Sequence, residues 1–218
     1  MNNTIFLTGA TGLVGGHILY RILREDASAK VIALVRSDSQ DHAWQRLENA
    51  LERLGFVLSG EELARIQLMV GDITEDKMGM SQETYDELAR QITHIIHSAA
   101  SVEFTLSLDE VRKVNTEGTK TVMALAKRAK TLGQLSRVAY ISTAYVSGMK
   151  TGTVLEDSNE QPTEFSNTYE KAKFEADSFV RSLMGGLPIM VFRPSIIVGD
   201  SQTGCTSRFN VLYPMTRL

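Results

Sequence analysis

The sequence predicts an α/β protein with one parallel β-sheet that is covered by helices on both faces. Short apolar runs alternate with longer helical patterns along the 218 residues, which is the order of repeated strand–helix–strand units. A glycine-rich turn follows the first apolar run. The composition, 43% hydrophobic and 22% charged, is typical of a domain that buries one substantial core.

Apolar runs predict strands near residues 4–8, 31–35, 66–70, 93–97, 137–142 and 189–193. Helical patterns lie near residues 13–25, 41–54, 81–90, 109–131 and 166–184. The second helix is amphipathic, because apolar side chains recur at helical spacing at Trp44, Leu47, Leu51 and Leu54. We therefore expect a doubly wound, three-layer α/β/α sheet of the Rossmann type with strand order 3-2-1-4-5-6.

The overall charge and the cysteine content exclude several classes of protein. A net charge of −3 gives no electrostatic reason to expect nucleic acid or an anionic membrane as a partner. Cys205 is the only cysteine, so no disulfide forms within the chain, and a reducing compartment is expected. The sequence shows no signal peptide and no membrane span, which predicts a cytoplasmic protein. Nothing near His17 or His94 suggests a metal site.

The first strand runs into a glycine-rich loop, Thr8-Gly9-Ala10-Thr11-Gly12-Leu13-Val14-Gly15, and a helix begins there. Gly9 allows the tight turn, Gly12 lets the backbone approach a pyrophosphate, and Gly15 lets the helix pack close to the strand. The phosphates would meet free N–H groups and the positive end of the helix dipole. Glycines also serve simple turns, but the position between a strand and a helix is the context that a dinucleotide-binding loop requires.

The end of the second strand indicates which dinucleotide binds. The residue that recognises the adenosine ribose is expected about 20 residues after the loop, where NAD-binding proteins usually carry Asp or Glu. This sequence has Val35 and then Arg36. An arginine can pair with a 2′-phosphate, and no carboxylate there repels it. We therefore predict NADP(H) rather than NAD(H); the alternative is that Arg36 is a solvated surface charge.

Two further strand ends contribute to the predicted cofactor crevice. Asp72 and Ile73 follow the third strand, and Ser98-Ala99-Ala100 follows the fourth. Ligands of open α/β sheets bind at the carboxyl ends of the strands, and small residues suit the close passage of a cofactor. His97 is interpreted as a hydrogen-bonded structural residue rather than a base.

The residues predicted for chemistry follow the fifth strand. Tyr169 and Lys173 stand four residues apart, so both side chains project from one helix face. A neighbouring ammonium favours the phenolate and lowers the pKa of a tyrosine. Thr143, at the end of the fifth strand, offers a hydroxyl that can hydrogen-bond a substrate carbonyl oxygen. The structural alternatives are a strand-end threonine and a half-buried aromatic residue.

Taken in order, these motifs resemble the extended short-chain dehydrogenase/reductase family, which combines Thr-Gly-x-x-Gly-x-x-Gly with Tyr-x-x-x-Lys. The resemblance covers nearly the whole chain. It includes residues 8–15, 71–73, 97–100, 115–119, 141–148, 169–173 and 192–195. Three segments look most like the male-sterility or thioester-reductase branch, which includes fatty acyl-CoA reductases. They are residues 97–102, 142–146 and 199–204.

The resemblance implies a role for each matching residue. Tyr169 would be the acid/base, and Lys173 would bind the nicotinamide ribose and lower the pKa of Tyr169. Thr143 would hold the substrate carbonyl, with Ser142 as the alternative hydroxyl. Asn115 matches an asparagine that supports a water relay to the lysine; the alternative is a helix N-cap.

Further residues are implied to lie beside the cofactor or to shape its surroundings. Arg193, Pro194 and Ser195 are expected beside the cofactor, with Pro194 and Ser195 flanking the nicotinamide. Gly118 would let its helix pack closely on the sheet.

We expect two segments, an NAD(P)-binding domain at residues 1–204 and the start of a truncated substrate-binding region at residues 205–218. In extended relatives, residues beyond the sixth strand supply most of the substrate lobe, so we expect that lobe to be largely absent. An uncovered apolar patch would favour a homo-oligomer.

Three functions are compatible with the sequence. The first is an NADPH-dependent oxidoreductase that transfers hydride to a small-molecule carbonyl or acyl-thioester substrate. The second is a nucleotide-sugar epimerase or dehydratase, whose relatives mostly prefer NAD. The third is a non-catalytic NADP(H)-binding module. Arg36 and the branch resemblance favour the first.

Overall fold

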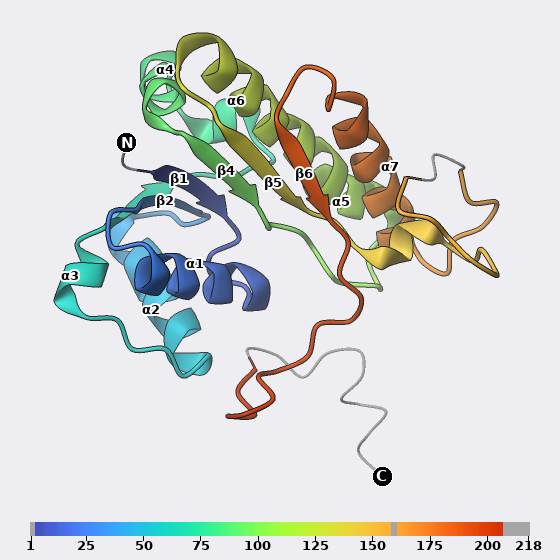
Figure 1. Ribbon diagram of the computed structural model, residues 1–218, viewed down its shortest axis with the longest axis horizontal. Helices are drawn as coiled ribbons and strands as arrows, with labels where there is room; N and C mark the ends of the chain where they lie inside the picture. Colours follow the sequence, from blue (N-terminus) through green and yellow to red (C-terminus); the bar gives the residue numbers. More distant parts are fainter. Residues whose placement is uncertain (1–2, 158–160, 207–218) are drawn as a thin grey trace.

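The computed structural model describes residues 3–157 and 161–206, and in that part of the chain six parallel strands form one sheet (Figure 1). The strand order is β3-β2-β1-β4-β5-β6, as predicted. The strands are β1 (Thr4–Thr8), β2 (Lys30–Val35), β3 (Ile66–Val70), β4 (His94–His97), β5 (Arg137–Ile141) and β6 (Ile189–Phe192).

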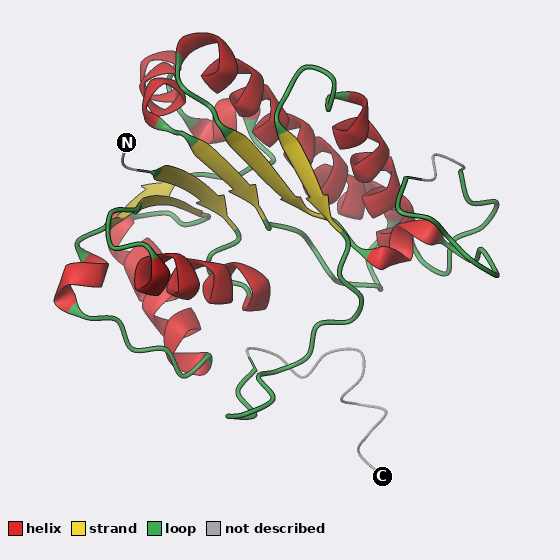
Figure 2. Cartoon of the chain, in the orientation of Figure 1, coloured by secondary structure: helices red, strands yellow, loops and turns green. Residues whose placement is uncertain are grey.

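Helices cover both faces of the sheet and make three layers (Figures 1 and 2). One face carries α1 (Leu13–Glu25), α2 (Gln40–Arg53) and α3 (Gly60–Leu63). The other carries α4 (Gln82–Gln91), α5 (Leu108–Arg112), α6 (Gly118–Leu132) and α7 (Thr168–Ser182). Three short elements lie between them: the turn η1 (Asp76–Gly79), with left-handed backbone at Lys77 and Met78, the π-helix η2 (Lys113–Glu117) and the 3₁₀ helix η3 (Ala144–Ser147).

The two faces of the sheet bury separate apolar clusters. Phe6, Ile95 and Tyr140 pack with α4, α6 and α7. Leu7 and Val31 pack with α1 and α2. The predicted amphipathic helix is confirmed as α2, which buries Leu47 and Leu51 in the second cluster and packs Trp44 at its edge.

The predicted helix at residues 109–131 is interrupted by the π-helix η2. Asn115 lies inside η2, with helical turns on both sides, so the interpretation of Asn115 as a helix N-cap is wrong. Ser107 caps the start of α5 instead, by accepting a hydrogen bond from Glu110 N. The sequence analysis also missed α3, a single turn with a capping box formed by Ser59 and Glu62.

Glycines are required where the first loop meets its neighbours. Gly9 has φ +79°, and a Cβ there would lie 2.7 Å from Ala99 N. A Cβ on Gly15 would lie 2.1 Å from Gly9 O, so α1 approaches the end of β1 as closely as predicted. A Cβ on Gly118 would lie 2.7 Å from Ile73 Cδ1, so the close contact of α6 is with the segment after β3.

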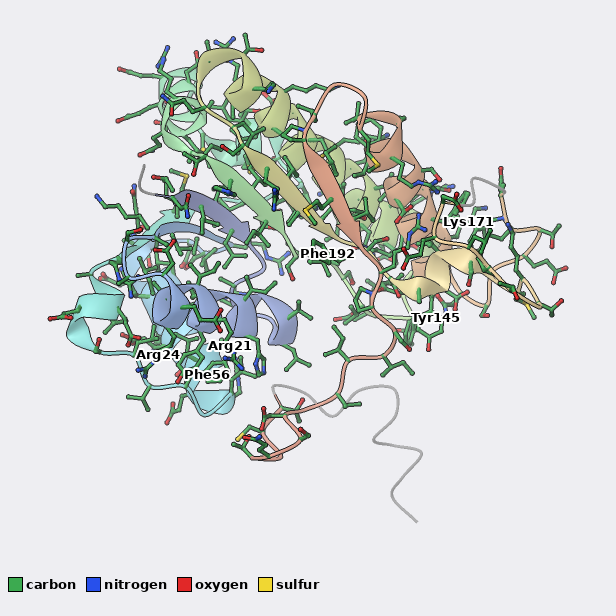
Figure 3. The ribbon with its side chains drawn as sticks, in the orientation of Figure 1. Arg21, Arg24, Phe56, Tyr145, Lys171 and Phe192 are labelled. Atoms are coloured by element: carbon green, nitrogen blue, oxygen red, sulfur yellow. The ribbon has the colours of Figure 1, made fainter. Side chains whose placement is uncertain are left out.

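At β5 and β6, the sheet face that carries α1 and α2 is partly uncovered. Met190 is 42% and Phe192 44% exposed, and Phe192 lies at the end of β6 (Figure 3). Within residues 3–157 and 161–206, no helix is long and apolar enough to cross a membrane. Apart from Cys205 and Thr206, the expected start of a substrate-binding region at 205–218 lies outside the described residues.

Replacing Gly15 should destabilise the fold. In Gly15→Ala the new methyl group would overlap Gly9 O, so α1 or the loop must shift, at a cost of about 1–3 kcal/mol in the free energy of unfolding. Gly60→Ala is the control, because nothing lies within 4 Å of a Cβ there. Denaturant unfolding of both variants measures the difference. Equal stability would contradict the close packing of α1.

Candidate active site

The carboxyl ends of β1, β4 and β5 meet at one edge of the sheet, and the glycine loop lies there. Gly12 is the exposed N-cap of α1, with no side chain capping the helix and no acidic residue in its first turn. The amide of Gly12 donates to Gly9 O, which closes the loop. An uncapped helix start with free N–H groups and a positive dipole end fits the pyrophosphate of a dinucleotide.

Two arginines lie at the carboxyl end of β2. Arg36 is 69% exposed, with its Nη1 3.9 Å from Asp72 Oδ2. Arg46, from α2, donates from Nη1 to the Arg36 carbonyl oxygen at 2.5 Å. The sequence analysis missed Arg46, because its contact with the strand end depends on how α2 packs. The other Asp72 oxygen accepts from Thr74 N, so this carboxylate orders the loop after β3.

His97 is structural, as interpreted from the sequence. Thr119 Oγ1 donates to Asn115 O, so it accepts from His97 Nε2, and His97 Nδ1 then accepts from Thr8 Oγ1 at 2.7 Å. Burial lowers the pKa of His97 to about 3, so the ring is neutral. Ala99 N also donates to Thr8 Oγ1, which fixes the small residues after β4 against the glycine loop.

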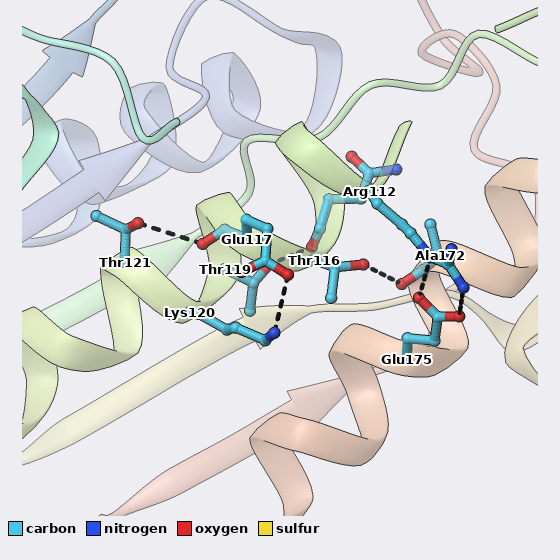
Figure 4. A network of polar contacts seen from close by, with 9 residues as sticks. Arg112, Thr116, Glu117, Thr119, Lys120, Thr121, Ala172 and Glu175 are labelled. Carbon is cyan, nitrogen blue, oxygen red and sulfur yellow. Dashed lines mark hydrogen bonds and ion pairs between the residues drawn. The ribbon is translucent and has the colours of Figure 1, made fainter. Parts of the chain in front are cut away.

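Helix α7 is held firmly against η2 and α5 (Figure 4). Arg112 makes a two-pronged ion pair with Glu175, with nitrogen–oxygen distances of 2.8 and 2.6 Å. Thr116 donates to the carbonyl oxygen of Ala172 at 3.1 Å. Asn167 caps α7 by accepting from Glu170 N. These contacts fix the helix that carries Tyr169 and Lys173.

Tyr169 lies in the first turn of α7, where its hydroxyl hydrogen-bonds that of Thr143. The Phe104 ring meets the Tyr169 ring edge-on, with centroids 5.6 Å apart. Burial raises the pKa of Tyr169, and the Thr143 hydroxyl opposes that rise. The predicted lowering of this pKa by Lys173 is therefore wrong, because burial outweighs every lowering contact and Lys173 is not among them.

Lys173 is fully buried and donates to two oxygens of β5. Its Nζ lies 2.9 Å from Tyr140 Oη and 2.9 Å from Ile141 O, and it sits over the Tyr140 ring. Burial lowers the pKa of Lys173 to about 7, and the charge of Asp177 opposes the shift. The lysine thus faces the strand rather than the Tyr169 hydroxyl.

A buried ion pair lies one turn further along α7. Asp177 accepts from Arg193 Nη2 at 2.5 Å and from Arg193 Nε at 3.0 Å. It also accepts from the Ser142 hydroxyl at 2.5 Å. Arg193 uses its remaining nitrogen on the carbonyl oxygen of Glu156, so its guanidinium is bound to protein groups. These contacts favour Thr143 over Ser142 as the available hydroxyl. They also give Arg193 a structural role, and its predicted place beside the cofactor stays a prediction.

Thr143 lies next to the segment after β6. Its Oγ1 donates weakly to Pro194 O at 3.4 Å, and Ala144 N donates to the same oxygen at 2.8 Å. Ser195 is exposed. The Pro194 carbonyl thus lies against the Thr143 hydroxyl, and the place of Pro194 and Ser195 beside the nicotinamide stays a prediction.

Asn115 clamps the loop after β4 with both ends of its amide. Its Oδ1 accepts from Ser101 N at 2.7 Å and its Nδ2 donates to Ser101 O at 2.9 Å. The predicted water relay stays a prediction.

Among residues 3–157 and 161–206, no group of three or more His, Cys, Asp or Glu side chains is arranged to hold a metal ion.

Comparison with known proteins assigns the family. Residues 7–218 match the male sterility protein family of NAD-binding domains. The chain belongs to this family. It is 33% identical over 209 residues to the aldehyde reductase lnbA of Aspergillus flavus, spanning 92% of this chain and 20% of that protein. It is 27% identical to the L-2-aminoadipate reductase of Schizosaccharomyces pombe, spanning 98% of this chain and 16% of that protein.

Among solved structures, this chain is similar to the terminal R domain from the myxalamid PKS-NRPS biosynthetic pathway. The TM-score is 0.86 at 30% identity, over 94% of this chain and 51% of that one. The predicted extended short-chain dehydrogenase/reductase fold and the thioester-reductase branch are confirmed by these matches. The chain spans a fifth or less of the two curated relatives and about half of the solved domain.

Breaking the Asp177–Arg193 pair should destabilise the protein. Asp177→Asn leaves the Arg193 guanidinium, whose side chain is 19% exposed, without its paired carboxylate, at a cost of about 3 kcal/mol in unfolding free energy. Glu117→Gln is the control, because its ion pair with Lys120 is exposed and contributes less than about 1 kcal/mol. Urea unfolding at pH 7 compares the two variants. A small and equal effect would contradict the role assigned to Asp177.

Proposed function

We propose that this chain forms the nucleotide-binding part of an NADPH-dependent reductase acting on a carbonyl or acyl-thioester substrate. The contact between the Tyr169 and Thr143 hydroxyls at the carboxyl end of β5 carries the proposal. β5 lies two strands from β1, so the two strand ends are about 10 Å apart. That spacing suits a dinucleotide with its phosphates at the glycine loop and its nicotinamide beside Tyr169.

In the proposed reduction, Thr143 and Tyr169 have different roles. Bound NADPH supplies a hydride to the substrate carbon. Thr143 Oγ1 exchanges its weak bond to Pro194 O for one to the substrate carbonyl oxygen. Tyr169 gives its proton to that oxygen as the C=O π bond breaks. Because burial raises the pKa of Tyr169, the phenol holds its proton at neutral pH, as a proton donor must.

The relatives support the reaction class. An aldehyde reductase and an L-2-aminoadipate reductase align over at least 92% of this chain. A reductase, rather than a nucleotide-sugar epimerase or a non-catalytic module, is therefore the function we propose. Arg36 and Arg46 support NADP(H) over NAD(H), because both guanidinium groups lie at the end of β2 where the adenosine ribose is expected.

The NADP(H) preference should depend on Arg36. Arg36→Glu replaces a 2′-phosphate partner with a repelling carboxylate, so the Kd for NADPH should rise at least about tenfold while NADH binding changes little. Arg53→Glu, an exposed charge change at the end of α2, is the control. Calorimetry at one pH and salt concentration measures both ligands. NADH binding as tight as NADPH binding in the unsubstituted protein would contradict the assignment.

The reduction should depend on both hydroxyls. Tyr169→Phe should lower kcat about 100-fold or more with little change in the Kd for NADPH, because it removes the proton donor. Thr143→Val should lower kcat about 100-fold, whereas Thr143→Ser should retain most activity. NADPH oxidation with a panel of aldehydes and acyl thioesters measures this.

The control for Tyr169 is Tyr20→Phe on α1, where the ring stacks on Phe56 on the other face of the sheet. Its activity should equal that of the unsubstituted protein. If the unsubstituted protein binds NADPH but oxidises it with no member of the panel, the proposed function is wrong.

A further inference from the structure

Tyr140 is a buried tyrosine whose hydroxyl lies inside a polar network rather than at the protein surface. It is 1% exposed, on the face of β5 that packs against α6 and α7. Its oxygen accepts a hydrogen bond from Lys173 Nζ at 2.9 Å, and the nearby hydroxyls of Thr119 and Ser142 act to lower the pKa of Tyr140. A phenylalanine would fill the same space, so the hydroxyl needs an explanation beyond packing.

The lysine depends on β5 for its position. Of the three Nζ protons, one goes to Tyr140 Oη and one to Ile141 O, which leaves one proton for a ligand at the carboxyl edge of the sheet. The Ile141 carbonyl alone would let the ammonium swing about a single acceptor. Two acceptors on one strand, with the Tyr140 ring 4.5 Å from Nζ, fix its direction.

The network behind Tyr140 reaches the glycine loop. Thr119, whose hydroxyl lies near that of Tyr140, accepts from His97 Nε2 at 3.0 Å, and His97 accepts from Thr8 at the start of the loop. Thr119 itself donates to Asn115 O inside η2. Buried hydrogen bonds thus join the phosphate loop to the π-helix, and Tyr140 with its lysine lies beside them.

We propose that Tyr140 is a positioning residue that holds the Lys173 ammonium in place, and in its charged form, for the nicotinamide ribose. This inference rests on the proposed reductase function. Tyr140 acts through Lys173 and touches neither the substrate nor the reacting atoms. Burial raises the pKa of Tyr140, so it remains a neutral hydroxyl and supplies a dipole rather than a charge.

Several titratable groups face Lys173 and decide in which direction its pKa should move when the Tyr140 hydroxyl is removed. They are Tyr140 on β5, His97 on β4 and Asp177 on α7. His97 is neutral, and Asp177 is paired with Arg193. Removing the Tyr140 hydroxyl takes an acceptor from the ammonium and leaves burial unchanged, so the charged form of Lys173 becomes less favourable.

The test compares Tyr140→Phe with Tyr85→Phe, the same change at a buried tyrosine on α4. Tyr140→Phe keeps the ring and its packing, and a thermal melt checks folding. NMR of lysine labelled at Cε and Nζ, without cofactor, gives the pKa of Lys173, with the signal assigned by its loss in Lys173→Met. We expect Tyr140→Phe to lower that pKa by about one pH unit and to raise the Kd for NADPH at pH 7 roughly tenfold. Tyr85→Phe should change neither.

A folded Tyr140→Phe protein with the Lys173 pKa of the unsubstituted protein would overturn the proposal. So would an unchanged Kd in a protein that binds NADPH. A merely structural role would lower the melting temperature without moving the lysine titration. If the unsubstituted protein bound no NADPH, the proposed function would fail, while the NMR titration would still decide the role of Tyr140.

Discussion

The buried ammonium of Lys173 is the constraint on which the rest of the site depends. A charge inside a protein is costly unless hydrogen bonds and counter-charges surround it, and here β5 supplies two oxygen acceptors while α7 supplies Asp177. Satisfying the ammonium therefore fixes the rotation and height of α7 against β5. Because Tyr169 lies one turn earlier on the same helix face, the same contacts bring its hydroxyl to Thr143.

Two ion pairs, one on each side of α7, hold this helix in its position against β5. Arg112 binds Glu175 on the side of η2, and Arg193 binds Asp177 on the side of β6. The second pair also orients the strand ends, since Asp177 accepts from Ser142 while Pro194, next to Arg193, accepts from the backbone that follows Thr143. The Asp177–Arg193 pair between α7 and β6 thus helps to position the loop that carries the Thr143 hydroxyl.

The strands, the long helices and the glycine loop could be predicted from sequence because each depends on local periodicity and turn chemistry. The π-helix could not, since an apolar pattern with one extra residue per turn still looks helical, and Asn115 was therefore open to interpretation as a cap. Contacts between distant segments were also beyond the sequence. Tyr140 looked like any core aromatic residue, and Arg46 and Phe104 join the site only through tertiary packing. Asp177 did carry a signal, because it lies four residues after Lys173 on the same helix face.

The directions of the two pKa shifts fit the reduction that we propose for this site. Burial moves both groups toward neutrality, raising the pKa of Tyr169 and lowering that of Lys173 to about 7. In the proposed reduction the tyrosine would therefore begin with the proton that the substrate oxygen takes up. As that proton leaves, negative charge develops on the phenol oxygen, and an ammonium one helical turn away then becomes more favourable than it was before. The lysine is held by Tyr140 and Ile141 in advance of that moment, so little reorganisation is needed when the charge appears.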